Sequence, residues 1–510
     1  MIVDGEGGRG LFADQQDAAI RVLSSRRRLD AVTGPAGAGK TATMKAVSTA
    51  WQQVHGPGSV VALAPAAVSA DVLGAALGLP AENVAKWLYE SAGPGSAARA
   101  QHYLLAEHVL QHPRSLAAAR GWRRRAVQVL AAVTAEQARW QFRPGQLVII
   151  DEASMVSTYQ LAALTAQATT AGAKLVLVGD PAQLDSIGAG GVLGWLDRSG
   201  QAVRLTSLHR FTHPWEATAS LQLREGNFDG VLEYQHHGRI RAGTDERMIE
   251  AAYDGWAADE AAGLASILIA PDNDTVTVLN RRAQTDRANK GLVDTRRTVR
   301  LADGLAAGRG DVILARRNDR RIRDTLGGFI RNGTILTITT HPTSAGTVTC
   351  VRKDTGATMV LNRGYLTRCA ELGYATTAQR SQGITVDTGH IVVTEGRLTR
   401  ELFYVGMTRG RDTNTAYIIE PDIETSDGIE RMDPTDLPRW PEILGQVLAA
   451  EGVEHTAHET RQELAESTDT LHQLAAEHDY LTQLAAADDL TGFLTTHSPG
   501  APADLRRSPA

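Results

Sequence analysis

The feature that most constrains this chain is a glycine-rich turn that ends in Lys40 and Thr41. The turn follows a short apolar run at residues 29–32 and precedes a helical pattern at residues 41–52. Glycines let consecutive N–H groups and a helix N-terminus point at one anion, while lysine reaches the β- and γ-phosphates and threonine can hold Mg²⁺. A chain with 49 glycines can form such a turn by chance. The complete strand, loop and helix pattern favours a nucleotide phosphate site formed by Gly34, Pro35, Ala36, Gly37, Ala38, Gly39, Lys40 and Thr41.

Two carboxylates follow a second apolar run. Residues 147–150 read Leu-Val-Ile-Ile and are followed by Asp151 and Glu152. Such a run is typical of a parallel strand covered on both faces, and its carboxyl end faces the ligand crevice. Asp-Glu pairs are common on surfaces, but downstream of a phosphate loop we expect Asp151 to hold Mg²⁺ and Glu152 to polarise the attacking water.

Further polar side chains come after strand-like runs or before the loop. Gln183 follows the run at residues 175–178 and is a candidate γ-phosphate sensor, and Arg210 follows residues 203–205. Arg210 could meet the phosphates from the other side of the site. Gln15 begins a helical pattern upstream of the loop and is a candidate adenine reader, because an amide both donates and accepts.

These runs predict a first parallel α/β domain at residues 1–205, with a helical insertion at about residues 81–143. A second α/β domain is expected at residues 206–304 and 371–420, with strands that include residues 267–270, 276–279, 391–393 and 417–419. Between its two parts, residues 305–370 contain short β-rich runs separated by Gly and Asn turns, which predicts a small β-barrel.

The charge is divided along the chain. The formal net charge is -6, but residues 421–510 hold 18 Asp and Glu against 5 Lys and Arg. Residues 305–370 hold 11 Lys and Arg against 4 Asp and Glu, so a polyanion partner is expected there, with a solvated charged face as the alternative. Two cysteines, Cys350 and Cys369, form neither a disulfide framework nor a zinc site, and no apolar run is long enough to span a bilayer, so a cytoplasmic protein is expected.

Two later stretches complete a set of motifs. Residues 374–383 read Tyr-Ala-Thr-Thr-Ala-Gln-Arg-Ser-Gln-Gly, and residues 402–411 read Leu-Phe-Tyr-Val-Gly-Met-Thr-Arg-Gly-Arg. Together with the first half, seven motifs in order across residues 11–420 resemble superfamily 1 DNA helicases of the RecD-like, 5'-to-3' branch. The nearest resemblance is to the helicase portion of MobF-type conjugative relaxases (TraA/TraI-like), through residues 382–387 and 404–411.

The resemblance implies two RecA-like domains, with an SH3-like barrel inserted in the second. It implies ATP and Mg²⁺ as cofactors, with Thr41 and Asp151 as metal ligands, and catalytic roles for Glu152, Gln183, Arg210 and Arg409. It places Gln15, Gln382 and Gly383 with the phosphate loop at the nucleotide, and residues 64–66 and 376–383 on the DNA strand. Family members usually have His where this chain has Gln379, and because Gln keeps a donor and an acceptor, weakened rather than lost coupling is expected.

The function implied is an ATP-dependent helicase or translocase moving 5'-to-3' on single-stranded DNA and at duplex junctions, in conjugative transfer or repair. The alternatives are a translocase that does not unwind and a weakened DNA-binding subunit. A separate relaxase or other conjugation and repair proteins are the implied protein partners.

Two expectations concern the ends of the chain. Residues 456–494 predict a docking helix within an acidic helical tail at residues 421–510, and residues 497–510 are expected to be disordered. DNA nicking is not expected, because a Tyr nucleophile and a metal-binding histidine cluster would have to precede Gln15. His236 and His237 are interpreted as an exposed pair inside the second domain, so the chain is expected to be a free-standing helicase or the motor half of a divided relaxase.

Overall fold

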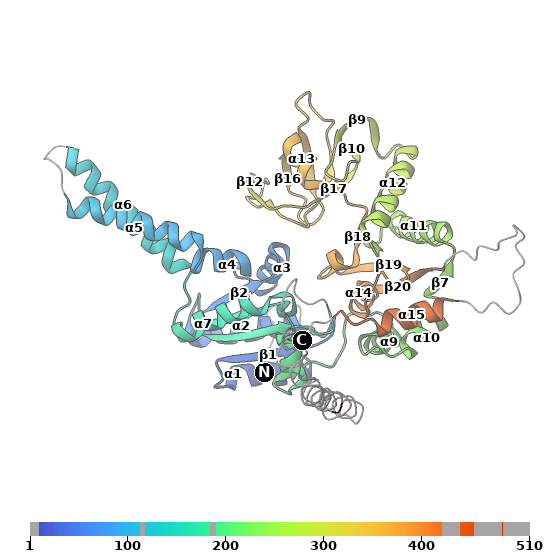
Figure 1. The fold of residues 1–510 in the computed structure, drawn as a ribbon, viewed down its shortest axis with the longest axis horizontal. Helices are drawn as coiled ribbons and strands as arrows, with labels where there is room; N and C mark the ends of the chain where they lie inside the picture. Colours follow the sequence, from blue (N-terminus) through green and yellow to red (C-terminus); the bar gives the residue numbers. More distant parts are fainter. Residues whose placement is uncertain (1–9, 113–117, 184–189, 421–438, 453–481, 483–510) are drawn as a thin grey trace, which may run out of the picture. The chain divides into compact units, whose positions relative to one another are not determined.

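Two parallel β-sheets organise the described part of the chain. The computed structural model describes residues 10–112, 118–183, 190–420, 439–452 and residue 482. Both sheets belong to one compact unit, residues 1–454. Their strands and helices alternate along the sequence, as Figure 1 shows.

The first sheet has the strand order β3-β2-β4-β5-β1-β6, and all its neighbouring strands are parallel. Its strands are β1 (Leu29–Thr33), β2 (Val60–Ala64), β3 (Ala81–Asn83), β4 (Leu147–Ile150), β5 (Lys174–Gly179) and β6 (Ala202–Arg204). The associated helices are α1 (Ala13–Ser24), α2 (Lys40–His55), α3 (Ala67–Leu77), α4 (Val84–Ser91), α7 (Thr158–Ala171), α8 (Val192–Arg198) and the short η1 (Ala153–Met155).

Alternate residues of the central strands enter opposite cores. Leu147 and Ile149 pack in one cluster with α1 and α2, whereas Val148 and Ile150 pack in the other with α7 and α8. Because successive side chains of a strand point to opposite faces, a strand covered on both sides needs apolar residues at every position. The continuous apolar run at residues 147–150 is therefore explained.

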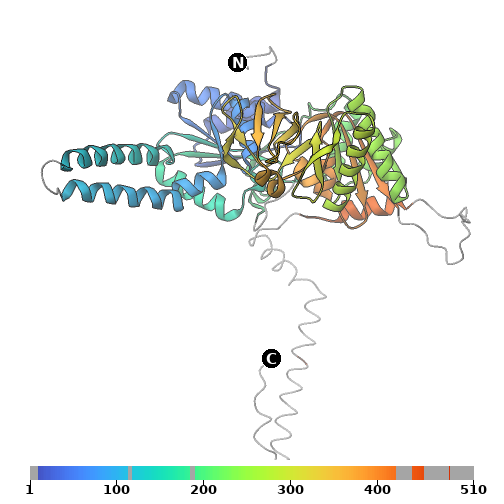
Figure 2. The same ribbon diagram turned by 90° about the horizontal axis from the view of Figure 1, so that it is seen from above.

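A helical hairpin is inserted into the first sheet's connections. It consists of α5 (Pro94–Gln111) and α6 (Ala118–Arg139), which pack against each other and project away from the sheet in Figures 1 and 2. Residues 81–83, which we expected to open this insertion, instead pair in parallel with β2 as the edge strand β3. The helical part thus begins after β3.

The second sheet has the order β18-β8-β19-β20-β7 and is also parallel. Its strands are β7 (Ile240–Gly243), β8 (Ser266–Ala270), β18 (Ala375–Thr377), β19 (Val386–Thr394) and β20 (Gly410–Ile419). Its helices are α9 (Pro214–Arg224), α10 (Asp229–His236), α11 (Asp245–Ala261), α12 (Asn273–Asn289), α14 (Arg400–Gly406), α15 (Trp440–Ala449) and η2 (Ala378–Ser381).

One predicted strand of this region is wrong. Residues 276–279 lie inside α12, not in the sheet. The Asp272 side chain caps this helix by accepting a hydrogen bond from the Thr275 N–H at 2.8 Å. Val276, Leu279 and Ala283 then fall on one buried face, so the apolar residues follow a helical period and not a strand period.

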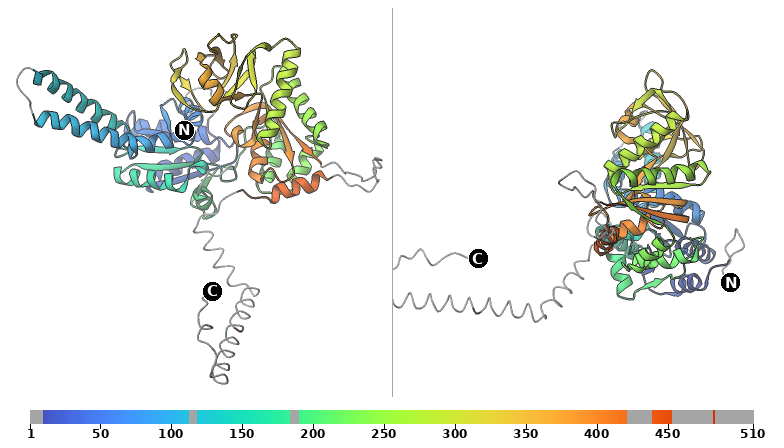
Figure 3. Two further views of the ribbon diagram at one scale, coloured as in Figure 1. Left: turned by 45° about the horizontal axis from the view of Figure 1, so that its top comes forward. Right: turned by 90° about the vertical axis from the view of Figure 1, so that its right-hand side faces the viewer.

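Residues inserted between α12 and β18 form antiparallel β structure, the yellow segment beside the second sheet in Figure 3. The strands are β9 (Asp294–Arg300), β10 (Ala306–Arg309), β11 (Val312–Ala315), β12 (Asp319–Arg323), β13 (Phe329–Ile330), β14 (Ile335–Ile338), β15 (Val348–Arg352), β16 (Thr358–Leu361) and β17 (Ala370–Leu372), with α13 (Arg363–Cys369) before the last. The largest sheet has the order β16-β15-β14-β11-β17, and two ribbons, β9-β10 and β12-β13, accompany it. We call residues 294–372 the β insertion.

The β insertion shares a core with the second sheet. Ile313 and Leu336 of the insertion belong to the same buried cluster as Trp256 of α11 and Leu268 of β8. The insertion is therefore packed onto the second sheet's helices and is not a separate globule. The predicted tail helix at residues 456–494 lies outside the described residues, apart from Thr482.

Candidate functional site

The loop between β1 and α2 adopts a shape that requires glycine. Gly37 and Gly39 have φ angles of 87° and 79°, in the left-handed region. A Cβ on Gly37 would lie 2.4 Å from the Cβ of Arg210, and one on Gly39 would lie 2.2 Å from Nε2 of Gln15. Backbone conformation and close neighbours therefore both demand glycine at these positions.

Lys40 and Thr41 occupy the first two positions of α2. The Lys40 ammonium folds back over the loop and donates to the carbonyl oxygens of Gly34 at 2.8 Å and Pro35 at 3.1 Å. A helix N-terminus and a flexible ammonium together form a site that suits an anion. The loop therefore has the donors that nucleotide phosphates require.

Asp151 and Glu152 lie directly after β4, and β5 separates this strand from β1. Burial, and then the charge of Glu152, raises the pKa of Asp151 to about 7, although Lys40 opposes this shift. Glu152 has a φ of 50°, and its N–H donates to Oδ1 of Asp151 at 3.0 Å. Asp151 is partly buried and is close enough to Lys40 to feel its charge, so its carboxylate oxygens fit Mg²⁺, which takes oxygen ligands.

Gln15 contacts the loop through both ends of its amide. Its Nε2 donates to the carbonyl of Ala38 at 3.1 Å, and its Oε1 accepts from the N–H of Phe12 at 3.2 Å. The side chain is buried. In this conformation Gln15 supports the phosphate loop, and its adenine-reading role remains a prediction.

Residues from the second half of the chain reach the same loop. The Tyr404 hydroxyl accepts a hydrogen bond from the Ala36 N–H at 3.1 Å. Gln382 Nε2 donates to Glu152 Oε2 at 3.4 Å, while its own Oε1 is buried and has no hydrogen-bond partner among the described residues. Gly383 follows with a φ of 79° and is exposed. Gln382 is thus in contact with the predicted water-activating carboxylate.

Arg210 lies against Gly37 of the loop, and its contact with the phosphates remains a prediction. Its neighbour His209 donates its N–H to the carbonyl of Gly37 at 3.1 Å, and Arg210 Nη1 donates to the carbonyl of Thr408 at 2.7 Å. Burial lowers the pKa of Arg210, and Glu152 is among the charges that oppose this. Arg210 therefore links the phosphate loop to the segment that precedes Arg409.

Arg409 is only 1% exposed and is bonded within the second half of the chain. Its Nε donates to the carbonyl of Val405 at 2.7 Å, and its Nη1 to that of Ile384 at 3.2 Å. Burial, and then the charge of Arg210, lowers its pKa to about 9. In this conformation the Arg409 guanidinium joins α14 to the segment before β19.

Asp180 is the centre of a buried polar cluster that the sequence analysis did not single out. Its carboxylate accepts from Gln183 Nε2 at 3.1 Å and from the Tyr404 hydroxyl at 3.2 Å, and it pairs with Arg224 at 2.9 Å. Burial raises the pKa of Tyr404, so the phenol stays protonated and can donate. Tyr404 lies within the quoted stretch 402–411, and Asp180 lies between the run at residues 175–178 and Gln183. No local signal identifies Arg224, which ends an ordinary amphipathic helix.

The histidine pair lies elsewhere. His236 and His237 are exposed at the end of α10, and His237 stacks on Trp215 with ring centroids 3.9 Å apart. Throughout the described ranges, no group of three or more His, Cys, Asp or Glu side chains is arranged to hold a metal ion. In the same ranges, no helix combines the length and apolarity that crossing a bilayer requires.

A parallel sheet whose first loop ends in Lys40 and Thr41, with a partly buried Asp-Glu pair at the end of β4, defines a P-loop nucleotide-binding protein. Residues 10–245 match the AAA domain family. The chain is 31% identical over 412 residues to a probable conjugal transfer protein TraA of Sinorhizobium fredii, covering 80% of this chain and 32% of the relative. It is 37% identical over 132 residues to the RecBCD enzyme subunit RecD of Mycobacterium tuberculosis, covering 25% of this chain and 21% of that protein.

These similarities relate the chain to the TraA conjugal transfer proteins and to RecD-like helicases. The chain spans about a third of the length of the TraA relatives that it matches. A crystal structure of Bacteroides Pif1 bound to ssDNA is also similar, with 16% identity, a TM-score of 0.46, and coverage of 81% of this chain and 94% of that one.

Proposed function

We propose that this chain is an ATP-driven motor that moves 5'-to-3' along single-stranded DNA and unwinds duplex junctions. One observation supports it above all. The phosphate loop is hydrogen-bonded by Tyr404 and by the His209 N–H, Arg210 lies against Gly37, and Glu152 is contacted by Gln382. A site shared in this way couples the state of the nucleotide to the separation of the two sheets.

In this proposal the two parallel sheets are RecA-like motor domains, at residues 1–205 and at residues 206–304 with 371–420. The helical hairpin is an insertion in the first, and residues 305–370 are an SH3-like barrel inserted in the second. In the described β insertion, β16 and β17 are the two edges of the largest sheet, so hydrogen bonds do not close this sheet into a barrel. The proposal of a barrel therefore rests on the antiparallel order of its strands.

The proposed chemistry uses residues already placed around the loop. Lys40 and the loop amides would bind the phosphates of ATP, and Thr41 and Asp151 would hold Mg²⁺, which neutralises phosphate charge when bound. Glu152 orients and activates the attacking water, and Gln183 senses the γ-phosphate through its contact with Asp180. Arg210, with Arg409, stabilises charge that develops in the transition state.

The proposed substrate is DNA, and the proposed location is the cytoplasm. The single DNA strand is proposed to cross residues 64–66 and residues 376–383. Ala66 and Gln379 are exposed in these segments, and Gln379 lines a cavity of about 280 Å³ beside Asn273. Contacts to the backbone and stacked bases would be largely independent of sequence. A separate relaxase or other transfer proteins are the proposed protein partners.

ATP hydrolysis measured with and without single-stranded DNA, followed by unwinding of duplexes with a 5' or a 3' overhang, tests the proposal. We expect DNA-stimulated hydrolysis and unwinding of the 5'-overhang substrate. Stimulated hydrolysis without unwinding would instead favour a translocase, and hydrolysis that ignores DNA would favour the weakened DNA-binding subunit.

A further inference from the structure

A partly enclosed pocket of about 260 Å³ lies where the β insertion meets the second sheet. One wall comes from β11 and β14, whose register pairs Val312 with Thr337 and Leu314 with Ile335. Because these are cross-strand pairs at alternate positions, the four side chains share one face of the insertion sheet. The opposite wall comes from the second sheet and its connections, through Ile267, Ala375 and Ile384. The two walls are therefore apolar where these side chains face the pocket, and polar side chains complete the lining.

The rim of this pocket is positively charged. It is formed by Arg287, Arg316, Lys353 and Arg380, against the single acid Glu260. Arg316 Nη1 and Arg380 Nη1 lie 2.7 Å and 3.6 Å from the same oxygen of Glu371. Burial, and then the charge of Arg316, lowers the pKa of Arg380. A second anion between these two guanidinium groups would relieve their repulsion.

Arg287 has a donor that no described residue satisfies. Its Nε is buried and has no hydrogen-bond partner in the described part of the chain. Its guanidinium carbon lies 5.5 Å from the centre of the Tyr374 ring, which lines the pocket as well. Buried donors are normally paired, so an acceptor on a ligand inside the pocket would complete this site.

The pocket adjoins the second segment proposed to contact the strand. Thr376 and Arg380 line it and belong to residues 376–383. Because they are part of that segment, a strand held by it passes the mouth of the pocket.

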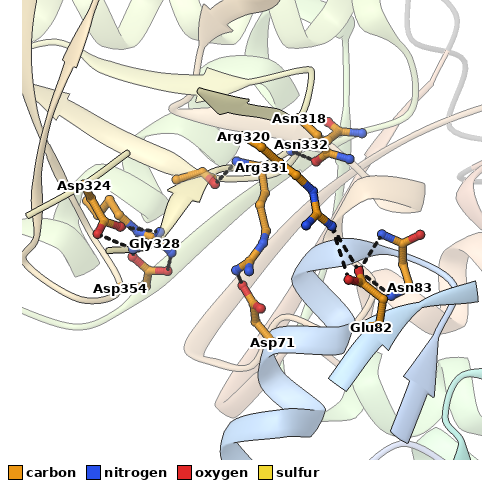
Figure 4. A network of polar contacts seen from close by, with 12 residues as sticks. Asp71, Glu82, Asn83, Asn318, Arg320, Asp324, Gly328, Arg331, Asn332 and Asp354 are labelled. Carbon is orange, nitrogen blue, oxygen red and sulfur yellow. Dashed lines mark hydrogen bonds and ion pairs between the residues drawn. The ribbon is translucent and has the colours of Figure 1, made fainter. Parts of the chain in front are cut away.

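The pocket also lies near α3, the helix that follows the proposed DNA-contact segment of the first sheet. Gly333 lines the pocket, and a Cβ built on it would lie 3.3 Å from Cγ2 of Val68 in α3. The neighbouring Arg331 pairs with Asp71 of the same helix, as Figure 4 shows. Since α3 begins directly after residues 64–66, the first proposed strand-contact segment lies near Gly333, while the second lines the pocket itself.

We propose that the pocket receives one nucleotide of the single strand, with its base unstacked from its neighbours against the Leu314 wall and its phosphate between Arg316 and Arg380. The proposal rests on the proposed single-strand motor function and names a base-binding site within it. A base has an apolar face for the wall and acceptor atoms for Arg287, and the backbone phosphate matches the cationic rim. A simple anion would leave the apolar wall unused.

Strands that carry one abasic unit test this proposal. A single strand of thymidines is anchored by a short duplex so that its register is fixed, and an abasic unit is placed at successive positions. Binding to the full chain is measured by fluorescence anisotropy. For the unsubstituted protein we expect one position at which the abasic unit weakens binding roughly tenfold, because base burial and stacking are lost there.

Leu314→Trp fills the pocket, and Val360→Trp places the same bulk on an exposed residue of the same insertion, 56% accessible, as the matched control. We expect Leu314→Trp to weaken binding of the complete strand and to abolish the position dependence, while Val360→Trp keeps both. Arg287→Met, which removes the donor with little change in bulk, should reduce the position dependence partially. Thermal melting followed by circular dichroism verifies that each variant is folded.

Strand binding without any abasic-sensitive position would overturn the pocket assignment and leave the motor proposal standing. Failure of every strand to bind would overturn the motor proposal itself. Free thymidine monophosphate, titrated calorimetrically, is expected to bind far more weakly than the strand. Equal affinity for the free nucleotide, lost in Leu314→Trp, would assign the pocket to a soluble nucleotide and overturn the strand assignment.

Discussion

At the scale of single residues, the loop predicts two variants with different defects. Lys40→Ala removes the ammonium that lies over the Gly34 and Pro35 carbonyls, so we expect loss of both ATP binding and turnover. Glu152→Gln keeps the side-chain shape but removes the water activator, so nucleotide should bind without turnover. Fluorescent-nucleotide binding and phosphate release distinguish the two. Hydrolysis by Glu152→Gln at the unsubstituted rate would refute its assignment.

The two arginines from the second half should behave differently. Arg210 makes one side-chain hydrogen bond to the Thr408 carbonyl and lies against Gly37, so Arg210→Ala should cut hydrolysis by about a hundredfold or more with little change in ATP affinity or melting temperature. Arg409 is bonded to backbone carbonyls in a buried position, so Arg409→Ala should also lower the melting temperature. Turnover and melting curves of both variants check this, and equal loss of ATP affinity and hydrolysis in Arg210→Ala would make Arg210 a ground-state ligand.

The sequence predicted the site residues that form contiguous motifs and missed those that meet only in the fold. The phosphate loop and the Asp-Glu pair could be predicted because their backbone geometry is encoded locally. Arg224 could not, because its contact with Asp180 joins residues 44 positions apart across the two sheets. Gln15 was recognised, but its bond to the Ala38 carbonyl depends on how α1 packs on the loop.

At the scale of elements, the apolar run at residues 147–150 was interpreted correctly because strands buried on both faces have no polar alternation. The strand predicted at residues 276–279 was wrong because four apolar or β-branched residues fit a helix as well as a strand. The cap at Asp272 favours the helix. The β-rich runs of the insertion were recognised from their turns, but β17 was not, because its three residues pair only with the distant β11.

The shared core changes how the insertion must be tested. Deleting residues 305–370 would remove Ile313 and Leu336 from a cluster that includes Trp256, so loss of folding would hide any effect on DNA. Substitution of exposed arginines of β12 leaves this core intact. Arg321→Gln with Arg323→Gln should lower the slope of log affinity for single strands against log salt by about 1.4 if both meet phosphates. Arg281→Gln, exposed on α12, is the matched control, and an unchanged slope in the double variant would place the strand elsewhere.

Glu216 gives α9 a pH-dependent contribution to stability. The side chain is fully buried, its Oε1 accepts from Asn414 at 2.8 Å, and burial raises its pKa from 4.5 to about 7. Because the folded pKa exceeds the unfolded one, the contribution of Glu216 to stability is greatest below pH 4.5 and is lost as pH rises through about 7. Glu216→Gln should therefore raise the unfolding free energy at pH 8 by up to about 3 kcal/mol and change little at pH 4. Denaturant titrations at both pH values test this, and an equal gain at both would show that ionisation is not the cause.

At the scale of the whole molecule, ion pairs connect the β insertion to the first sheet's elements. Arg320 Nη2 lies 3.2 Å from Glu82 in β3, and Arg331 pairs with Asp71 in α3, as Figure 4 shows. The Arg320–Glu82 pair is the more exposed of the two. An exposed pair contributes little to stability, about 0–1 kcal/mol, so this pair can break and re-form as the two sheets move. If hydrolysis drives that movement, a covalent bond at this position should stop it.

Glu82→Cys with Arg320→Cys, joined by a short bismaleimide, is expected to retain nucleotide binding but to lose unwinding and the stimulation of hydrolysis by DNA. The native Cys350 and Cys369 are buried and should not compete for the reagent. Each single cysteine variant treated in the same way is the control and should remain active, because one attachment leaves the halves free. Unwinding by the joined protein at the unsubstituted rate would mean that the insertion and the first sheet move as one body, and the step would then have to arise between the second sheet and the phosphate loop alone.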